Sequence, residues 1–305
     1  MIKISKSPRR LILVFVLVLT IEFLVIMVGN SAYYISRPII TDGGQIYQDY
    51  LYGEDPGHRG VDFIYPRGTN VYAVKGGIVV DMRENLEDGD ESTDWGNFVV
   101  IQHDQRHYDK TSGLWGYVYS MYLHLSENSI RVSESQHVSE GDWIAQTDDT
   151  GEYSDGDHLH LQIVIHHLSG RSLEPFTLDS ENNSRNPELW LKEYNSNTSR
   201  MVGKITYSDG TARPNVIICG AEKPYGGYTW SRTYSYSWAN PDDYYLENFG
   251  TVDINPGIYH LYAYEYQIPD DVCGATPLIK DIGWYTFSQN MTTFVGLYPV
   301  YIPLP

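Results

Sequence analysis

The chain has 305 residues, of which 42 % are hydrophobic and 20 % charged, so its composition is that of a globular protein and its length fits two domains. It has only two cysteines, and 39 acidic residues against 21 basic ones give a formal net charge of −18. This composition excludes disordered, collagen-like and disulfide-framework proteins. The negative charge also excludes a domain that binds nucleic acid through its phosphates.

The N-terminus carries a long apolar run, Leu11–Val28, which is interrupted only by Thr20 and Glu22. Four basic residues precede the run, so the positive-inside rule predicts that the N-terminus stays inside and the remainder is exported. The run is longer than the ~7–15 residues of a signal-peptide core and close to the shortest membrane-spanning helix. Residues 1–30 are therefore predicted to be a signal anchor that spans the membrane through residues 11–28, or a cleaved signal peptide. The protein is expected to be membrane-anchored and to face the exterior, or to be secreted if the segment is cleaved.

After a spacer at residues 31–49, the chain alternates short apolar runs with turn residues, a pattern typical of β-strands. An acidic stretch, Glu84–Asp94, lacks the glycine and glutamate spacing of a calcium loop, which favours a solvated loop. A short helix over Pro187–Tyr194 is expected to close a first domain at residues 50–194. The expected strands of this domain are Val71–Val74, Gly77–Met82, Asn97–His103, Tyr117–Leu123, Trp143–Gln146 and His158–Ile165.

A polar linker at residues 195–200 leads into a second series of short strands and turns, which predicts a small β-sandwich at residues 201–305. Both cysteines, Cys219 and Cys273, fall in this part. Outside the cell they could pair, but spacing alone does not show that they are close, so a free pair stays open. The expected strands are Gly203–Tyr207, Asn215–Cys219, Gly250–Ile254, Ile258–Tyr266 and Thr293–Val300.

Four of the ten histidines occur in patterns that suit a metal site. In His158-Leu159-His160 the two histidines alternate with a leucine, so in a strand both imidazoles lie on one face. The extended segment from His58 to Asp62 places a histidine and a carboxylate on one side. Two histidines and one carboxylate form an open zinc site, with the fourth position left for water.

A third pattern is Tyr122-Leu123-His124-Leu125, at the end of a strand. By strict alternation His124 lies on the side of Tyr122, opposite Leu123. A histidine that is not a ligand is useful here, because no H-E-x-x-H helix supplies a glutamate as general base.

Together, these motifs resemble the lysostaphin-type zinc endopeptidases, which cut peptide cross-links of peptidoglycan. The resemblance covers about residues 50–190 and implies an antiparallel β core. It also implies that Zn²⁺ is held by His58, Asp62 and His160, and that His124 and His158 are the catalytic histidines. The motifs that carry it are H-x-G-x-D at 58–62, Y-x-H-L at 122–125 and H-L-H at 158–160, with connecting stretches at 71–79, 95–103 and 138–145.

With this ligand set, His158 is the better candidate for the base that activates the zinc-bound water. His124 would stabilise the oxyanion or return a proton to the leaving amine, and the sequence does not separate the two roles. One departure from the family pattern is the acidic stretch Thr147–Asp157, which replaces a short glycine-rich turn and puts substrate choice in doubt.

The second domain has a shorter likeness, over Glu247–Tyr259, to the carboxypeptidase-regulatory-like β-sandwiches. It could bind sugar through exposed Trp230, Trp238 or Trp284, or act as a spacer. Three functions therefore compete: an active peptidoglycan endopeptidase, a non-catalytic relative that binds peptidoglycan or activates another hydrolase, and a polysaccharide-binding surface protein. All five expected site positions are filled, which favours the enzyme.

Overall fold

A computed structural model describes residues 34–51, 58–109, 113–152, 154, 156–167, 183–194, 197–226, 230–234, 247–266, 273–274 and 277–301. The predicted signal anchor or signal peptide at residues 1–30 lies outside these residues. Among the residues described, no helix is both long enough and apolar enough to cross a membrane. From Tyr34 onward the chain forms one compact unit. It is mostly β with almost no helix, as the sequence predicts, and its paired strands are antiparallel except for β10 (Ser199–Thr206) and β16 (Thr292–Tyr301), which run parallel.

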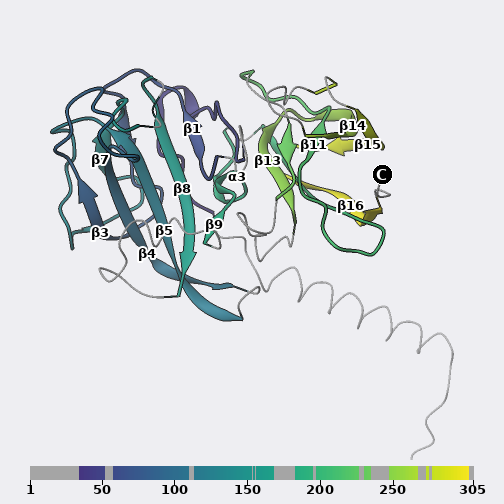
Figure 1. Cartoon of the computed structure of the whole chain (residues 1–305), viewed down its shortest axis with the longest axis horizontal. Helices are drawn as coiled ribbons and strands as arrows, with labels where there is room; N and C mark the ends of the chain where they lie inside the picture. The colour runs from purple at the N-terminus through teal and green to yellow at the C-terminus, as the bar shows by residue number, and fades with distance from the viewer. Residues whose placement is uncertain are drawn as a thin grey trace, which may run out of the picture. The chain divides into compact units, whose positions relative to one another are not determined.

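The first part of this unit is built on one antiparallel sheet with the strand order β1-β8-β5-β4-β3-β6, and β9 pairs with β8 (Figure 1). A separate pair, β2-β7, and one turn of helix, α3, complete this part. The bounds are β1 Val61–Phe63, β2 Asn70–Tyr72, β3 Gly77–Arg83, β4 Asn97–Asp109, β5 Leu114–Leu125, β6 His137–Val138, β7 Trp143–Gln146, β8 Leu159–His166, β9 Ser184–Arg185 and α3 Pro187–Trp190, with a 3-10 turn, η1, at Thr41–Gly43.

Strand β8 lies between β1 and β5, and its register explains the alternation in the sequence. Leu161 pairs with Val61 and Tyr122, and these side chains are all buried in the core on one face. On the other face His160 pairs with Asp62. Because successive residues of a strand point to opposite faces, His160 lies on the face opposite Leu161, and that face also carries a buried hydrophobic cluster that includes Met121, Leu123 and Val164.

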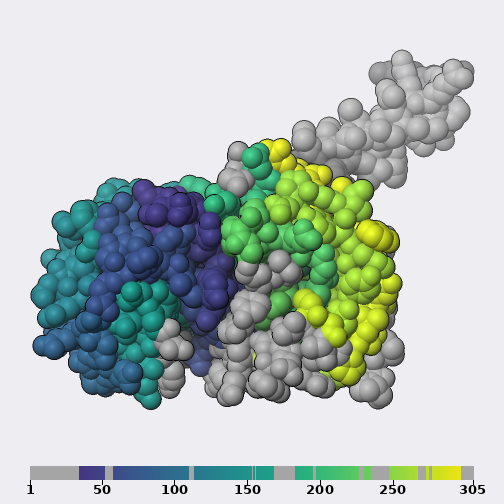
Figure 2. Space-filling view, turned by 90° about the horizontal axis from the view of Figure 1, so that it is seen from above, coloured from purple at the N-terminus to yellow at the C-terminus, as the bar shows by residue number. Residues whose placement is uncertain are grey.

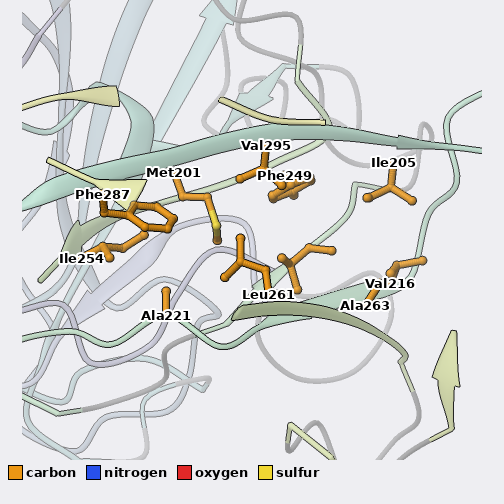
Figure 3. Packing of buried hydrophobic residues seen from close by; sticks show 11 residues of the cluster. Met201, Ile205, Val216, Ala221, Phe249, Ile254, Leu261, Ala263, Phe287 and Val295 are labelled. Atoms are coloured by element: carbon orange, nitrogen blue, oxygen red, sulfur yellow. The ribbon is translucent and has the colours of Figure 1, made fainter. Parts of the chain in front are cut away.

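The second part contains two sheets, β13-β10-β16 and β12-β11-β14-β15. Residues from both sheets pack into one hydrophobic cluster, which includes Met201, Phe249 and Val295 from the first and Val216 and Leu261 from the second (Figure 3). This shared cluster buries one face of each sheet. The bounds are β10 Ser199–Thr206, β11 Val216–Cys219, β12 Ser231–Arg232, β13 Phe249–Ile254, β14 Gly257–Glu265, β15 Leu278–Phe287 and β16 Thr292–Tyr301.

Strand β15 is absent from the strands expected from the sequence. It pairs with β14 along its length, but Gly283 has a φ of 105° and the register shifts beside it, so no strict alternation marks the strand. Of the three tryptophans considered for sugar binding, Trp230 is buried, Trp238 lies outside the described residues, and Trp284 is 67 % exposed. The Trp284 indole stacks on His260 with ring centroids 4.6 Å apart.

The two cysteines form a disulfide, Cys219–Cys273, with Cα atoms 5.8 Å apart. The two parts of the unit also contact each other through buried charges. Arg37 pairs with Asp253 at 2.5 Å, and Lys223 pairs with Asp49 at 2.6 Å. In Figure 2, the purple surface of the first described residues borders the green surface of the second part.

Candidate metal centre and its histidines

Asp62 and His160 are placed together by the pairing of β1 with β8, in which they are register partners. Nδ1 of His160 lies 3.0 Å from Oδ1 of Asp62. His58 precedes β1 and completes the group: its Nε2 lies 3.0 Å from the same carboxylate oxygen and 2.8 Å from Nδ1 of His160. Three donor atoms from two separate stretches of chain therefore converge on one point.

The donor set fits a zinc ion. Nδ1 of His58 donates a hydrogen bond to the backbone carbonyl of Asp49 at 3.3 Å, which leaves the lone pair of this imidazole on Nε2, facing the other two donors. Electron-pair donors this close repel one another unless a cation or a proton lies among them. Two imidazoles and one carboxylate are the ligands of an open zinc site.

Burial and mutual contact set the charges of these groups. Burial would raise the pKa of Asp62, but His58 and His160 hold it well below its usual range. Burial would also lower the pKa of His58, but the charge and hydrogen bond of Asp62 raise it above its ordinary value. Burial lowers the pKa of His160. At neutral pH Asp62 is therefore an anion inside the protein, and an anion held this way requires a cationic partner.

The ring of His124 lies on the side of the proposed metal site, which strict alternation along the strand does not predict. Its neighbour Leu123 is the register partner of His160, so alternation would turn His124 to the opposite face, with Tyr122. The backbone of His124 instead has a φ of 60°, in the left-handed region that non-glycine residues adopt rarely. The ring of His124 consequently lies 4.7 Å from that of His158 and 6.1 Å from that of His160, measured between centroids. The prediction that His124 shares the side of Tyr122 is wrong for this reason.

The acidic stretch after β7 orients both non-ligand histidines. Nδ1 of His124 donates to the carbonyl of Thr150 at 2.7 Å, and Nδ1 of His158 donates to the carbonyl of Gly156 at 2.8 Å. Backbone bonds of Asp148 connect the two: its N–H donates to the carbonyl of His124, and its carbonyl accepts from the N–H of His158. Each imidazole therefore keeps the lone pair on Nε2 when neutral. The sequence marked this stretch as a departure but did not show that it orients the site.

Arg67 pairs with several carboxylates of this stretch. Its Nε lies 2.7 Å from Oδ1 of Asp148, and its guanidinium also contacts Asp88, Asp149 and Asp157. Its backbone N–H donates to Asp157 at 3.0 Å. Asp88 belongs to the acidic stretch predicted as a solvated loop, so one arginine joins both acidic segments. This network holds the carbonyls of Thr150 and Gly156 where the histidines need them.

The surroundings of His124 keep it neutral. Burial, together with smaller contributions from the nearby His158 and His160, lowers its pKa to about 3. A neutral imidazole that donates through Nδ1 can accept a proton at Nε2. The structure thus brings together all five predicted residues: His58, Asp62, His124, His158 and His160.

Residues 56–175 match the model of peptidase family M23. The chain is also 35 % identical over 108 residues to the peptidoglycan DD-endopeptidase ShyA of Vibrio cholerae, and 28 % identical over 124 residues to ShyC, a peptidoglycan DD-endopeptidase of the same organism. These alignments cover 35 % and 40 % of this chain but only 20 % and 24 % of the relatives, so the chain spans about a fifth to a quarter of their length.

Among solved structures, a zinc-containing peptidase from Vibrio cholerae is similar with 26 % identity and a TM-score of 0.33, over 45 % of this chain and 39 % of that one. The catalytic domain of lysostaphin from Staphylococcus simulans is similar with 26 % identity and a TM-score of 0.30, over 44 % of this chain and 90 % of that one. The family match and the sequence relatives support a metalloendopeptidase, as the motifs predict.

Proposed function

We propose that residues 50–194 form a zinc-dependent endopeptidase that hydrolyses peptide bonds in the stem or cross-link peptides of peptidoglycan. The observation that carries this proposal is the convergence of two imidazole nitrogens and a carboxylate oxygen within 3.0 Å of one another, with two further histidines beside them. The peptidoglycan endopeptidases among the relatives support the choice of substrate.

In this proposal His58, Asp62 and His160 hold the metal. A zinc ion bound there supplies a water of lowered pKa and polarises the scissile carbonyl. The protein contributes a buried carboxylate whose charge is balanced only when a cation is present, and an imidazole whose tautomer is fixed by the Asp49 carbonyl. The fixed tautomer favours metal binding, whereas a proton competes with the metal for His58, whose pKa Asp62 raises.

His158 is assigned as the general base. Its Nδ1–H is engaged by the carbonyl of Gly156, so its free lone pair is on Nε2, which lies 3.8 Å from Oδ1 of Asp62. Nε2 of His158 accepts the proton of the nucleophilic water as it attacks the carbonyl. His124 also presents an acceptor at Nε2, beside the His158 ring. It would take over there the proton that His158 accepted from the water, and would then stabilise the oxyanion or give that proton to the leaving amine.

The enzyme is proposed to act on the outer side of the membrane, held by residues 11–28 or released if they are cleaved. The Cys219–Cys273 disulfide supports export, because disulfides persist in oxidising compartments. Residues 201–305 are proposed to be a β-sandwich that acts as a spacer or an adhesion module. The hydrophobic cluster common to its two sheets supports that architecture.

Zinc content and hydrolysis, measured together, test this proposal. The purified protein is expected to hold about one zinc per chain and to cleave defined muropeptides, with loss of cleavage after chelation and recovery after zinc is added back. A zinc-loaded protein that binds muropeptides without cleaving them would favour the non-catalytic relative. The N-terminal sequence of the membrane-bound and soluble fractions distinguishes anchor from cleaved signal peptide.

A further inference from the structure

Residues 47–51, termed here the flanking segment, run antiparallel to the stretch that carries two of the proposed metal ligands. The N–H of Tyr47 donates to the carbonyl of Asp62 at 2.8 Å, and the N–H of Asp62 donates to the carbonyl of Gln48 at 3.0 Å. At the other end, the N–H of Leu51 donates to the carbonyl of His58 at 2.7 Å. The backbone around His58 and Asp62 is therefore held by the flanking segment on one side.

Asp49 lies at the centre of this segment and bonds in two directions. Its backbone carbonyl accepts the Nδ1–H of His58, and its carboxylate accepts a hydrogen bond from Nζ of Lys223 at 2.6 Å. Both side chains are buried, and the second carboxylate oxygen, Oδ2, has no hydrogen-bond partner among the described residues. Lys223 is therefore the side chain that fixes the position of this carboxylate.

Lys223 belongs to the second part of the unit, between β11 and β12, and lies 174 residues from Asp49 in sequence. The same part also contacts the end of the flanking segment, because Nη1 of Arg232 donates to the carbonyl of Leu51 at 3.2 Å. Leu51 has a φ of 65°, a conformation that a leucine keeps only when its surroundings impose it. The second part thus holds the flanking segment at two points, on either side of Tyr50.

We propose that Lys223 is a positioning residue for the metal ligand His58, so that residues 199–301 help to set the metal affinity of the peptidase part. Lys223 fixes the Asp49 side chain, the Asp49 carbonyl fixes the tautomer and orientation of His58, and Nε2 of His58 faces the metal position. Partners that orient metal-ligating histidines typically change metal affinity by about 10–100-fold when removed. The inference rests on the proposed zinc site.

The test measures Zn²⁺ affinity by competition with a chelator, on the full-length protein with its disulfide intact. Lys223→Met keeps the length of the side chain and removes the charge, and it is expected to bind zinc about 10-fold or more weakly than the wild type. Lys204→Met is the matched control, because Lys204 is an exposed lysine on β10 of the same part. It is expected to keep the wild-type affinity.

The visible absorption of bound Co²⁺ reports ligand geometry directly, and is expected to shift in Lys223→Met but not in Lys204→Met. A core variant, Leu261→Ala, controls for stability: it lowers the melting temperature without touching the flanking segment and is expected to leave the Co²⁺ spectrum unchanged. Lys223 also lies 3.4 Å from the buried carboxylate of Glu188, so should Lys223→Met fail to fold, the combined variant Asp49→Asn, Glu188→Gln and Lys223→Met replaces the lysine and both of its carboxylate partners with neutral side chains.

A folded Lys223→Met or combined variant with wild-type zinc affinity and cobalt spectrum would overturn the positioning role. If the wild type binds zinc but cleaves no muropeptide, the proposed function fails while the affinity series still decides the role of Lys223. If the wild type binds no zinc at all, both proposals are wrong.

Discussion

The carbonyl oxygen of Thr150 accepts the Nδ1–H of His124 at 2.7 Å, and the backbone of Gly96 lies against the same oxygen. A Cβ on Gly96 would lie 2.1 Å from this oxygen, closer than any real contact allows. Gly96→Ala must therefore displace the group that orients His124. Since a displacement of about 1 Å near a catalytic group can cost about 100-fold in rate, we expect a loss of kcat/KM for muropeptide hydrolysis of at least about 10-fold.

Gly89→Ala is the matched control for this variant. Gly89 has a φ of 65°, close to the 61° of Gly96, but a Cβ there would meet nothing within 4 Å. Both alanines carry the backbone strain of the left-handed region, roughly 1–2 kcal/mol. Equal losses of activity in the two variants would show that strain, and not displacement of the Thr150 carbonyl, is responsible.

His124→Ala and His158→Ala are expected to retain zinc and to lose activity by roughly 100-fold or more, the scale typical of removing a general base or an oxyanion donor. Neither side chain is among the three, His58, Asp62 and His160, that converge on the metal position. Zinc content and single-turnover hydrolysis measure the two effects separately. His137→Ala, which removes a half-exposed ring on β6, is the control. Loss of zinc in His158→Ala would mean that His158 and His160 have exchanged roles.

Replacing any one proposed ligand is expected to abolish stoichiometric zinc binding. His58→Ala, Asp62→Ala and His160→Ala each leave two protein ligands, which do not hold an open zinc site. Elemental analysis after dialysis gives the zinc content per chain. Asp94→Ala removes an exposed carboxylate outside the site and should keep about one zinc. Full zinc occupancy in Asp62→Ala would contradict the ligand assignment.

The sequence predicts the ligand face well because a strand has a fixed period of two. His158, His160 and their leucines alternate, and the register of β8 with β1 then brings His160 opposite Asp62. Four strands of the first sheet, β3, β4, β5 and β8, are expected from the sequence, although β4 ends six residues later than expected, whereas the short strands β1, β6 and β9 are not among those expected. Where apolar and polar residues alternate cleanly, local pattern and tertiary burial favour the same structure.

The orientation of His124 and His158 and the pairing of Asp49 with Lys223 depend on contacts that a local sequence pattern does not predict. The left-handed backbone at His124 breaks the alternation at one residue, and the carbonyls of Thr150 and Gly156 act through main-chain atoms that every residue has. The pairing of Asp49 with Lys223 joins residues 174 apart in sequence. These relationships arise only once the sheets are folded, so composition and spacing do not reveal them.

The Cys219–Cys273 disulfide closes a loop with a sequence separation of 54 residues. By the loop-entropy relation, such a crosslink stabilises the folded state by about 4 kcal/mol, mainly by restricting the unfolded chain. Cys219→Ser with Cys273→Ser is therefore expected to lower the free energy of unfolding by about that amount in urea titrations. Wild-type protein measured with a reductant should show the same loss, and a difference below about 1 kcal/mol would show that the loop is already ordered when unfolded.

His103, which lies far in sequence from the proposed metal ligands, makes the free energy of unfolding depend on pH. Its ring is buried, and Nε2 lies 2.9 Å from the hydroxyl of Ser120. Burial lowers its pKa to about 3, with a smaller contribution from the charge of Lys75. In the unfolded chain a histidine titrates near ~6.5. Between these two values the unfolded chain binds a proton that the folded protein does not, so stability is lost as the pH falls through this window.

The slope of this loss is fixed by one proton and equals about 1.4 kcal/mol per pH unit once the pH is well below ~6.5. His103→Gln keeps a hydrogen-bonding group near Ser120 but does not titrate. As the pH falls, the free energy of unfolding of this variant should therefore decrease less steeply than that of the wild type, and the difference between the two slopes should equal the one-proton slope. Urea titrations from pH 7 to pH 5 on metal-free protein measure the difference without a contribution from zinc release. Parallel stability curves for His103→Gln and the wild type would show that the folded protein takes up the proton at His103.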